Sequence, residues 1–284
     1  MVTGKTKNLG VIGYPIVHSL SPAMQNAAIE KANIDYEYIA LPVAPDNLSN
    51  AVNGLKALEF RGFNVTIPHK TDIMQFLDEI DADAKIIGAV NTVVNDNGKL
   101  TGFNTDIIGF VDGLRANNFD VSGKTAVMLG AGGAARAIIW GLIKENAEKI
   151  VIGVRNPAKV KPIADYFQQY IKIEVYEWGS MDFRKSLNGA SLLINTTPLG
   201  MFPNTDTMPP VDFADVNKEA LVYDIIYTPE KTKLLSEAEK YGHHTVNGEI
   251  MLVGQGAAAL KKWTGCEPNT TVMLFALRNA LNNK

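Results

Sequence analysis

The sequence predicts an α/β protein built from two domains, and three observations carry that prediction. Strand-like and helix-like segments alternate from residue 8 to residue 77, the order of a mainly parallel sheet covered by helices. A glycine-rich turn at residues 129–136 joins an apolar strand-like run to a helix-like run, and further strands and helices follow it. The chain of 284 residues is long enough to form two separate cores.

The first series of elements is predicted from the spacing of apolar residues. Ser21 is a common type of N-cap and Pro22 suits the first helical turn, so a helix is expected to follow. Asn97 and Gly98 stand between two extended runs, which predicts a two-residue hairpin within residues 92–100. Strands are expected at residues 9–12, 36–41 and 62–67, and further helices at residues 48–58 and 71–77.

The second series begins with a helix at residues 107–114 and continues as a doubly wound, Rossmann-type sheet. Two amphipathic helices, at residues 249–263 and 269–281, are expected to return to the first domain. The sequence therefore predicts one domain from residues 1–106 with 248–284, and a second from residues 107–247. The strands of the second domain are expected at residues 125–129, 149–154, 172–176, 191–195 and 221–225.

The glycine-rich turn is expected to bind the pyrophosphate of a dinucleotide. Gly130 permits a tight turn, Gly132 lets backbone approach a phosphate, and the small Ala135 lets helix and sheet pack closely. The phosphates would then lie at the N-terminus of the following helix.

A basic residue follows the next strand, where an NAD enzyme usually carries an acidic one. Arg155 stands there, and Lys159 follows one helical turn later. Either these residues form a solvated basic loop or they bind a 2′-phosphate. We favour the second reading, and with it NADP over NAD.

Two serines flank the N-terminus of the first predicted helix. Ser19 and Ser21 either cap this helix or bind an anion such as a carboxylate. Their loop follows the first strand of the sheet, which is where α/β sheets bind ligands.

Lys70 follows the strand at residues 62–67 and is a candidate for proton transfer if it lies beside the acidic Asp106. Asn91 and Asp106 also follow apolar runs, so they either hydrogen-bond hydroxyl groups or form turns. His18 and His69 have no carboxylate partner at a fixed spacing, and we interpret both as structural.

Composition excludes several classes of function. The net charge is −3 with no basic block, so nucleic acid is not an expected partner. No apolar run approaches the roughly 20 residues that span a bilayer, and residues 1–8 lack the apolar core of a signal peptide. A cytoplasmic location is therefore expected. Cys266 is the only cysteine and the four histidines lack metal-ligand spacing, so neither a disulfide nor a metal site is predicted.

Seven ordered motifs cover nearly the whole chain. The most specific are GYPIVHSLSP at residues 13–22, NVTIPHK at residues 64–70 and NGEIMLVGQGA at residues 247–257. The others lie at residues 88–92, 102–106, 130–135 and 195–201. Together these motifs resemble those of the shikimate dehydrogenase family.

The resemblance implies NADP-dependent interconversion of shikimate and 3-dehydroshikimate in chorismate biosynthesis, physiologically as a reduction. It implies that Lys70 and Asp106 form the catalytic pair. The residues implied around the substrate are Ser19 and Ser21 for its carboxylate, and Thr66, Asn91, Tyr227 and Gln255 for its hydroxyls. Those implied around NADP are Gly130, Ala131, Gly132, Gly133, Ala134, Val154, Arg155, Asn156, Lys159, Ile225 and Gly248.

Two alternatives stay open. The first is a quinate/shikimate dehydrogenase with relaxed use of NAD and NADP, because Gln25 and Asn26 are closer to that branch of the family. The Thr-Ile-Pro-His-Lys motif argues against this branch, and so does the absence of an acidic residue soon after Arg155. A catalytically silent NADP-binding sensor is the alternative from another class, but it would not need Lys70 and Asp106. The expected partners are a small-molecule substrate and the cofactor, without nucleic acid or membrane, in a monomer or homodimer.

Overall fold

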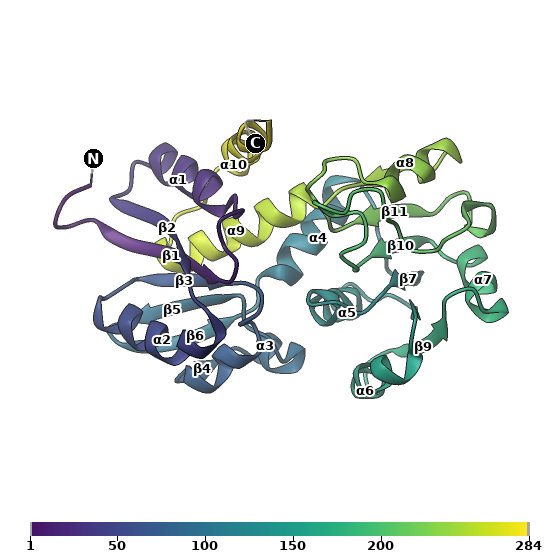
Figure 1. Cartoon of the computed structure of the whole chain (residues 1–284), viewed down its shortest axis with the longest axis horizontal. Coiled ribbons are helices and arrows are strands. Elements are labelled where there is room, and N and C mark those ends of the chain that lie inside the picture. The colour runs from purple at the N-terminus through teal and green to yellow at the C-terminus, as the bar shows by residue number, and fades with distance from the viewer. Residues whose placement is uncertain (1, 283–284) are drawn as a thin grey trace. The chain divides into compact units, whose positions relative to one another are not determined.

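The computed structural model describes residues 2–282, and the chain divides into two compact units. Unit 1 combines the chain up to Gly109 with the chain from Val253 onward, and unit 2 is Phe110–Leu252. Each unit has its own sheet of six strands covered by helices (Figure 1). The predicted two-part α/β fold class is therefore confirmed. Within the described part of the chain, none of the helices combines the length and the apolar character that crossing a bilayer requires.

The strand directions in the sheet of unit 1 bring the ends of β1, β3 and β6 and the start of β5 to one edge of the sheet. Its order is β2-β1-β3-β5-β6-β4, with β1 parallel to β2 and β3, and β5 antiparallel to both β3 and β6. The carboxyl ends of β1, β3 and β6 therefore lie at the same edge as the start of β5. The strands are β1 (Lys7–Gly13), β2 (Tyr36–Pro42), β3 (Gly62–Val65), β4 (Glu79–Ile80), β5 (Thr92–Asp96) and β6 (Lys99–Phe103).

The turn between β5 and β6 is the predicted two-residue hairpin. Asn97 and Gly98 have φ values of 52° and 88°, the left-handed backbone that such turns require and that asparagine and glycine tolerate. This short turn fixes the register in which Asn95 pairs with Leu100 and Thr92 with Phe103.

Helices cover both faces of this sheet, with α2 on one face and α1, α9 and α10 on the other (Figure 1). Trp263 of α9 is buried, and its Nε1 donates a hydrogen bond of 2.8 Å to the Val93 carbonyl of β5. The predicted return of the C-terminal helices to the first unit is therefore confirmed. The helices are α1 (Ser21–Ala32), α2 (Leu48–Ala57), α3 (Ala82–Ile87), α9 (Glu249–Thr264) and α10 (Thr270–Asn282), with α4 (Asp106–Ala116) at the boundary between the units.

The helix predicted at residues 71–77 is a 3-10 helix rather than an α-helix. The segment forms a 3-10 helix, Asp72–Phe76, in which Ile73 is the buried residue. It follows a tight turn, in which the His69 N–H donates to the Thr66 carbonyl, and β4 begins three residues later. Five residues are too few for a cooperative α-helix, so the tighter form results. A second 3-10 helix, Pro45–Asn47, precedes α2.

The sheet of unit 2 is wholly parallel, in the order β12-β11-β10-β7-β8-β9. Numbered within the unit, this order is 6-5-4-1-2-3, which is that of Rossmann-type sheets read from the other edge. The strands are β7 (Thr125–Leu129), β8 (Lys149–Val154), β9 (Lys172–Glu177), β10 (Leu192–Asn195), β11 (Leu221–Asp224) and β12 (Thr245–Val246).

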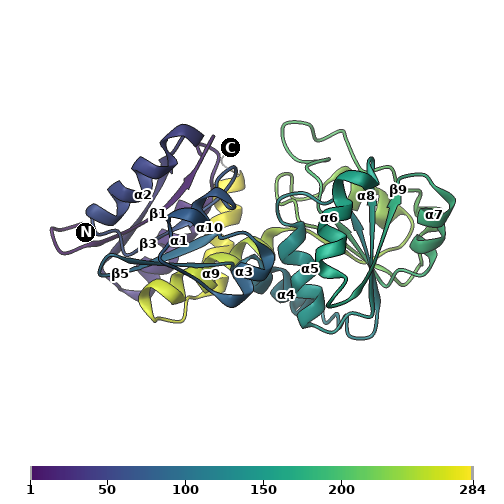
Figure 2. The ribbon, with the colours of Figure 1, turned by 90° about the horizontal axis from the view of Figure 1, so that it is seen from below.

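Helices α5 and α6 lie on one face of this sheet, and α7 and α8 on the other (Figure 2). On the second face, Phe183 of α7 and Leu234 of α8 pack in one buried cluster with Val127 and Val151 of the central strands. The helices are α5 (Ala135–Lys144), α6 (Pro157–Phe167), α7 (Met181–Asn188) and α8 (Lys233–Lys240), with a 3-10 helix at Phe213–Asp215.

Candidate active site

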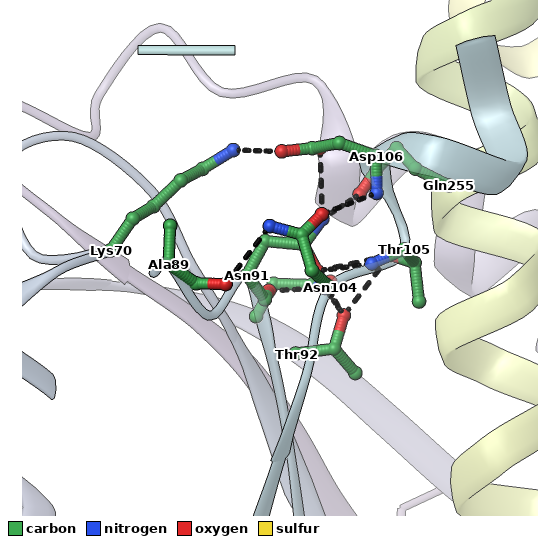
Figure 3. A network of polar contacts seen from close by, with 9 residues as sticks. Lys70, Ala89, Asn91, Thr92, Asn104, Thr105, Asp106 and Gln255 are labelled. Carbon is green, nitrogen blue, oxygen red and sulfur yellow. Dashed lines mark hydrogen bonds and ion pairs between the residues drawn. The ribbon is translucent and has the colours of Figure 1, made fainter. Parts of the chain in front are cut away.

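Lys70 and Asp106 form an ion pair at the carboxyl edge of the unit 1 sheet (Figure 3). The Lys70 Nζ lies 2.6 Å from Asp106 Oδ2, and the two side chains are only 22% and 9% exposed. Lys70 lies beyond the end of β3, whereas Asp106 is the first residue of α4, where the helix dipole stabilises negative charge. The pair joins two segments that are far apart in sequence and that the strand order brings together.

Asn91 connects this pair to the C-terminal part of unit 1. Its Oδ1 accepts the Thr105 N–H at 2.8 Å, and a backbone N–H is only a donor, so the amide orientation is fixed. The Nδ2 therefore donates to Asp106 Oδ1 at 2.8 Å and to Gln255 Oε1 at 3.4 Å. Both oxygens of Asp106 thus act as acceptors, one for Lys70 and one for Asn91, as the oxygens of a carboxylate do.

A shell of buried hydroxyls and amides holds Asn91 in place (Figure 3). The hydroxyls of Thr92 and Thr105 both donate to Asn91 Oδ1, at 2.9 and 3.1 Å. The Asn64 Nδ2 donates to Thr92 Oγ1 and to the Asn91 carbonyl, both at 3.1 Å. Sequence reasoning missed Thr92, Thr105 and Asn64 as part of the site. All three stand within the family motifs, but nothing in the sequence shows that their side chains converge on Asn91.

The prediction that Ser21 caps the first helix is wrong. Ser21 is the first residue of α1, and Leu20, at the N-cap position, makes no side-chain cap. The Ser19 Oγ instead accepts the Ser21 N–H at 3.3 Å, so Ser19 already satisfies that donor. Ser19 lies in the loop after β1 and Ser21 opens α1, at the same sheet edge as the ion pair.

The Tyr38 hydroxyl donates to Asn64 Oδ1 at 2.7 Å and also interacts with the Ser21 side chain. Burial raises the pKa of Tyr38 well above its ordinary value, and the contact with Ser21 opposes this rise. Tyr38 thereby links the serine loop to the residues around Asn91. Nothing in the sequence pointed to it, because it lies within an ordinary apolar strand.

The remaining predicted substrate residues are distributed over both units. Thr66 directly follows β3 in unit 1 and packs closely on Gly13, where an added Cβ would lie 2.5 Å from Thr66 Cγ2. Tyr227 belongs to unit 2, in the segment after β11, and burial raises the pKa of its hydroxyl. His69 is buried with Nε2 2.7 Å from the Val43 carbonyl oxygen, a structural contact.

The glycine-rich turn between β7 and α5 has the geometry of a phosphate-binding turn. Gly130 has a φ of 91°, and a Cβ on Gly132 would lie 2.5 Å from the Thr196 carbonyl oxygen. A Cβ on Gly133 would meet nothing within 4 Å, so this side of the turn is open. Helix α5 starts at Ala135, and Ala134 at its N-cap position provides no side-chain cap, which leaves N–H groups of the first turn for an anion.

The basic residues after β8 are exposed. Arg155 and Lys159 follow the buried Val154, and Asn156 precedes α6 without capping it through its side chain. Among residues 2–282, neither Arg155 nor Lys159 forms an ion pair with a carboxylate. Their charges are therefore available to an anionic ligand.

The ends of β10 and β11 are joined by a buried carboxylate that the sequence did not single out. Asp224 accepts hydrogen bonds from Thr232 Oγ1 at 2.7 Å, Asn195 Nδ2 at 3.0 Å and the Ile226 N–H at 3.1 Å. Burial nevertheless raises the pKa of Asp224 to about 6. Asp224 thereby shapes the segment that contains Ile225.

Gly248 packs on this same segment. A Cβ on Gly248 would collide with the Ile225 carbonyl, and the Gly248 N–H donates to the Ile226 carbonyl at 2.9 Å. Close backbone packing is thus a sufficient reason for glycine here.

The fold and the site together define an α/β protein with a Rossmann-type nucleotide unit and a polar, ion-paired site in its other unit. The chain belongs to the shikimate dehydrogenase family. The model of the shikimate dehydrogenase substrate binding domain matches residues 11–93, and that of the shikimate 5′-dehydrogenase C-terminal domain matches residues 250–278. The family resemblance of the sequence is therefore confirmed.

Similar proteins cover nearly the full length of the chain. A shikimate dehydrogenase (NADP(+)) of Carboxydothermus hydrogenoformans is 46% identical over 277 residues, which is 97% of this chain and 98% of the relative. A crystal structure of a shikimate dehydrogenase in complex with NADP+ has 43% identity and a TM-score of 0.91, covering 98% of this chain and 97% of that one. A 5-ketofructose reductase of Gluconobacter sp. strain CHM43 has 35% identity and a TM-score of 0.90, covering 98% and 99%.

Proposed function

We propose that the chain is an NADP-dependent oxidoreductase that interconverts shikimate and 3-dehydroshikimate, the step of chorismate biosynthesis that its family performs. The observation that carries the proposal is the Lys70–Asp106 ion pair at 2.6 Å, held by Asn91 at the ligand-binding edge of the unit 1 sheet. The names of the relatives supply the substrate and the cofactor. Unit 1 is proposed to bind the substrate and unit 2 the cofactor.

The residues of unit 2 fit a dinucleotide phosphate. The positive φ of Gly130, the open side of Gly133 and the uncapped start of α5 supply the turn, the space and the donors for a pyrophosphate. Arg155 and Lys159 supply positive charge for a 2′-phosphate. Ala131, Ala134, Val154, Asn156, Ile225 and Gly248 are proposed to complete this site.

Lys70 is proposed to supply the proton. When bound, NADPH provides the hydride for the reduction of the substrate carbonyl. The ammonium group of Lys70 has three N–H donors, and Asp106 accepts one of them. A second donor is therefore available to the carbonyl oxygen, which takes the proton as it becomes a hydroxyl. Asp106 and Asn91 orient Lys70 for this transfer.

Other residues of unit 1 are proposed to hold the substrate. Ser19 lies in the loop after β1 and Ser21 is the first residue of α1, and we propose that their hydroxyls and the start of the helix hold a carboxylate. Thr66, Asn91 and Gln255 are proposed to contact ring hydroxyls. For Tyr227 the same role stays a prediction of the family resemblance.

The direct test is an absorbance assay of NADPH formation by the purified chain. We expect turnover with shikimate and NADP, and a much lower kcat/KM when NAD replaces NADP. Arg155→Ala is expected to weaken NADP binding about tenfold or more, with little change for NAD, because it removes a charge-assisted contact. No turnover of shikimate with either cofactor would contradict the proposal.

Quinate and 5-ketofructose are the substrates to test beside shikimate. Quinate is used by the quinate/shikimate dehydrogenase branch, which Gln25 and Asn26 resemble. The structurally similar protein from Gluconobacter is named as a 5-ketofructose reductase. A higher kcat/KM with either compound would replace the proposed substrate while keeping the reaction class. The cytoplasmic location and the choice between monomer and homodimer stay predictions.

A further inference from the structure

Arg155 and Trp178 lie side by side at the carboxyl ends of two neighbouring parallel strands. In the register of β8 and β9, Val154 is opposite Glu177, so Arg155 and Trp178 are the next pair along. The Trp178 N–H donates to the Val154 carbonyl at 2.9 Å, which continues the ladder beyond the strand. The Arg155 guanidinium carbon lies over the Trp178 ring, 6.0 Å from its centroid.

Trp178 is a fixed partner, whereas Arg155 is exposed. The indole packs against the buried cluster that contains Phe183 and Leu187 of α7. The chain turns sharply after it, at Gly179 with a φ of 78°, and Ser180 then caps α7 through the Phe183 N–H. The ring is therefore held from both the core and the backbone.

A cation–π contact attracts the charge of a guanidinium without using its N–H donors as a hydrogen bond or an ion pair would. Arg155 has no carboxylate partner among the described residues, so these donors are not consumed by an ion pair. Its side chain is therefore both positioned and available. Since a free arginine loses rotamer entropy when it binds a ligand, prior positioning lowers the cost of binding.

We propose that Trp178 is a specificity-determining residue: its ring holds Arg155 at the site of the 2′-phosphate and so strengthens the preference for NADP over NAD. The inference rests on the proposed function, because it assumes that the adenosine end of the cofactor lies after β8. Trp178 itself is a positioning residue. The phosphate contact belongs to Arg155.

The test measures binding to the full chain by calorimetry, with 2′,5′-ADP and 5′-AMP as probes that differ in the 2′-phosphate. We expect Trp178→Leu to weaken 2′,5′-ADP binding about threefold to fivefold and to leave 5′-AMP binding unchanged. Tyr176→Leu is the matched control, because Tyr176 packs against the same cluster two residues earlier on β9. It is expected to change neither affinity.

A second arm tests the route of the effect. In an Arg155→Ala background, Trp178→Leu is expected to cause no further loss, because the two residues act through one contact. Trp178→Phe keeps an aromatic ring that attracts a cation more weakly, so its affinity for 2′,5′-ADP should fall only about twofold. This variant replaces Trp178→Leu in the test if the leucine variant does not fold.

The outcomes separate the two proposals. Wild-type protein that binds 2′,5′-ADP no better than 5′-AMP would overturn the NADP assignment and this inference with it. Wild-type discrimination that survives Trp178→Leu unchanged, an equal loss for both probes, or a full loss in the Arg155→Ala background would overturn the inference alone.

Discussion

At the residue scale, the hydrogen-bonding arrangement of the proposed catalytic pair depends on the orientation of one side-chain amide, that of Asn91. Asn91 is oriented by the Thr105 N–H, and its Nδ2 then binds one oxygen of Asp106 while Lys70 binds the other. A flip of this amide would turn its oxygen toward the carboxylate. The buried hydroxyls around Asn91 prevent such a flip, because they donate to the oxygen in its present position.

Thr92→Val tests this shell. The substitution keeps the shape of the side chain but leaves an Asn64 donor and the Asn91 oxygen short of one partner each. We expect a loss of about 1–3 kcal/mol in the free energy of unfolding, together with a lower kcat. Thr101→Val, on the neighbouring β6, is the control, and it should stay within about 0.5 kcal/mol. Unchanged stability and kcat in Thr92→Val would show that Asn91 does not need this support.

The two serines are expected to separate stability from binding. Ser19→Ala removes the acceptor of the Ser21 N–H and should cost about 1 kcal/mol in the free energy of unfolding, as lost caps do. Ser21→Ala should raise KM for shikimate, with kcat nearly unchanged. Denaturant titration and steady-state kinetics measure the two effects. If neither variant altered KM, the carboxylate would have to bind elsewhere.

At the element scale, one glycine in the unit 1 sheet and one in α9 allow α9 to pack closely on its neighbours. A Cβ on Gly62 would collide with Trp263 of α9, and it would lie 2.5 Å from the Val93 carbonyl oxygen. Gly256, on α9 itself, faces α1, where the buried Gln25 donates to the Gly256 carbonyl at 2.9 Å. The α9 helix that carries Gln255 is thus fixed by contacts with both the sheet and α1.

Gly62→Ala is expected to destabilise unit 1 by about 2–4 kcal/mol, because overpacking forces the tryptophan or the strand to move. Gly54→Ala is the matched control. Gly54 lies within α2, where an added Cβ meets nothing within 4 Å, so alanine should stabilise by about 0.5–1 kcal/mol. Chemical denaturation of the two variants gives the comparison. Equal effects of the two substitutions would contradict the packing described.

Asp224 makes the stability of the region where β10, β11 and the start of α8 meet depend on pH. Its pKa of about 6 in the folded protein is above the ordinary value of 3.8, so folding favours the protonated form. The stabilisation that comes from protonated Asp224 is therefore fully present below about pH 4, and it is lost as the pH rises through 6. The difference between the two pKa values corresponds to about 3 kcal/mol.

Asp224→Asn is neutral at every pH and keeps an oxygen for Asn195 and Ile226. We therefore expect wild-type protein to lose stability relative to this variant between pH 4 and 8. The free energies of unfolding of both proteins across this range measure the effect. Parallel curves would show that Asp224 does not titrate as described.

At the scale of the whole molecule, much of the fold follows from local sequence patterns. The apolar spacing predicted most of the strands and helices because each has a clear period, and Asn97-Gly98 predicted the hairpin because few other residues adopt its backbone. The helix at 71–77 was predicted without its 3-10 type, since periodicity does not distinguish a short 3-10 helix from an α-helix.

Part of the candidate site could also be predicted from the sequence. Lys70, Asn91 and Asp106 stand at chain positions that the sheet order brings to one edge, so their meeting could be expected. Tyr38 and Thr92 could not be found this way, because their contributions depend on which neighbour each side chain meets after packing.

The central claim is that Lys70 and Asp106 act together in the proton transfer that accompanies hydride transfer, and single-variant and double-variant kinetics test it most directly. We expect Lys70→Ala to lower kcat by roughly 10²–10⁴-fold with NADP affinity nearly unchanged. Asp106→Asn should also lower kcat, and the double variant should lose less than the product of the single losses, because the two groups share one contact. A Lys70→Ala enzyme with near-normal kcat, or losses that multiply fully, would contradict the account.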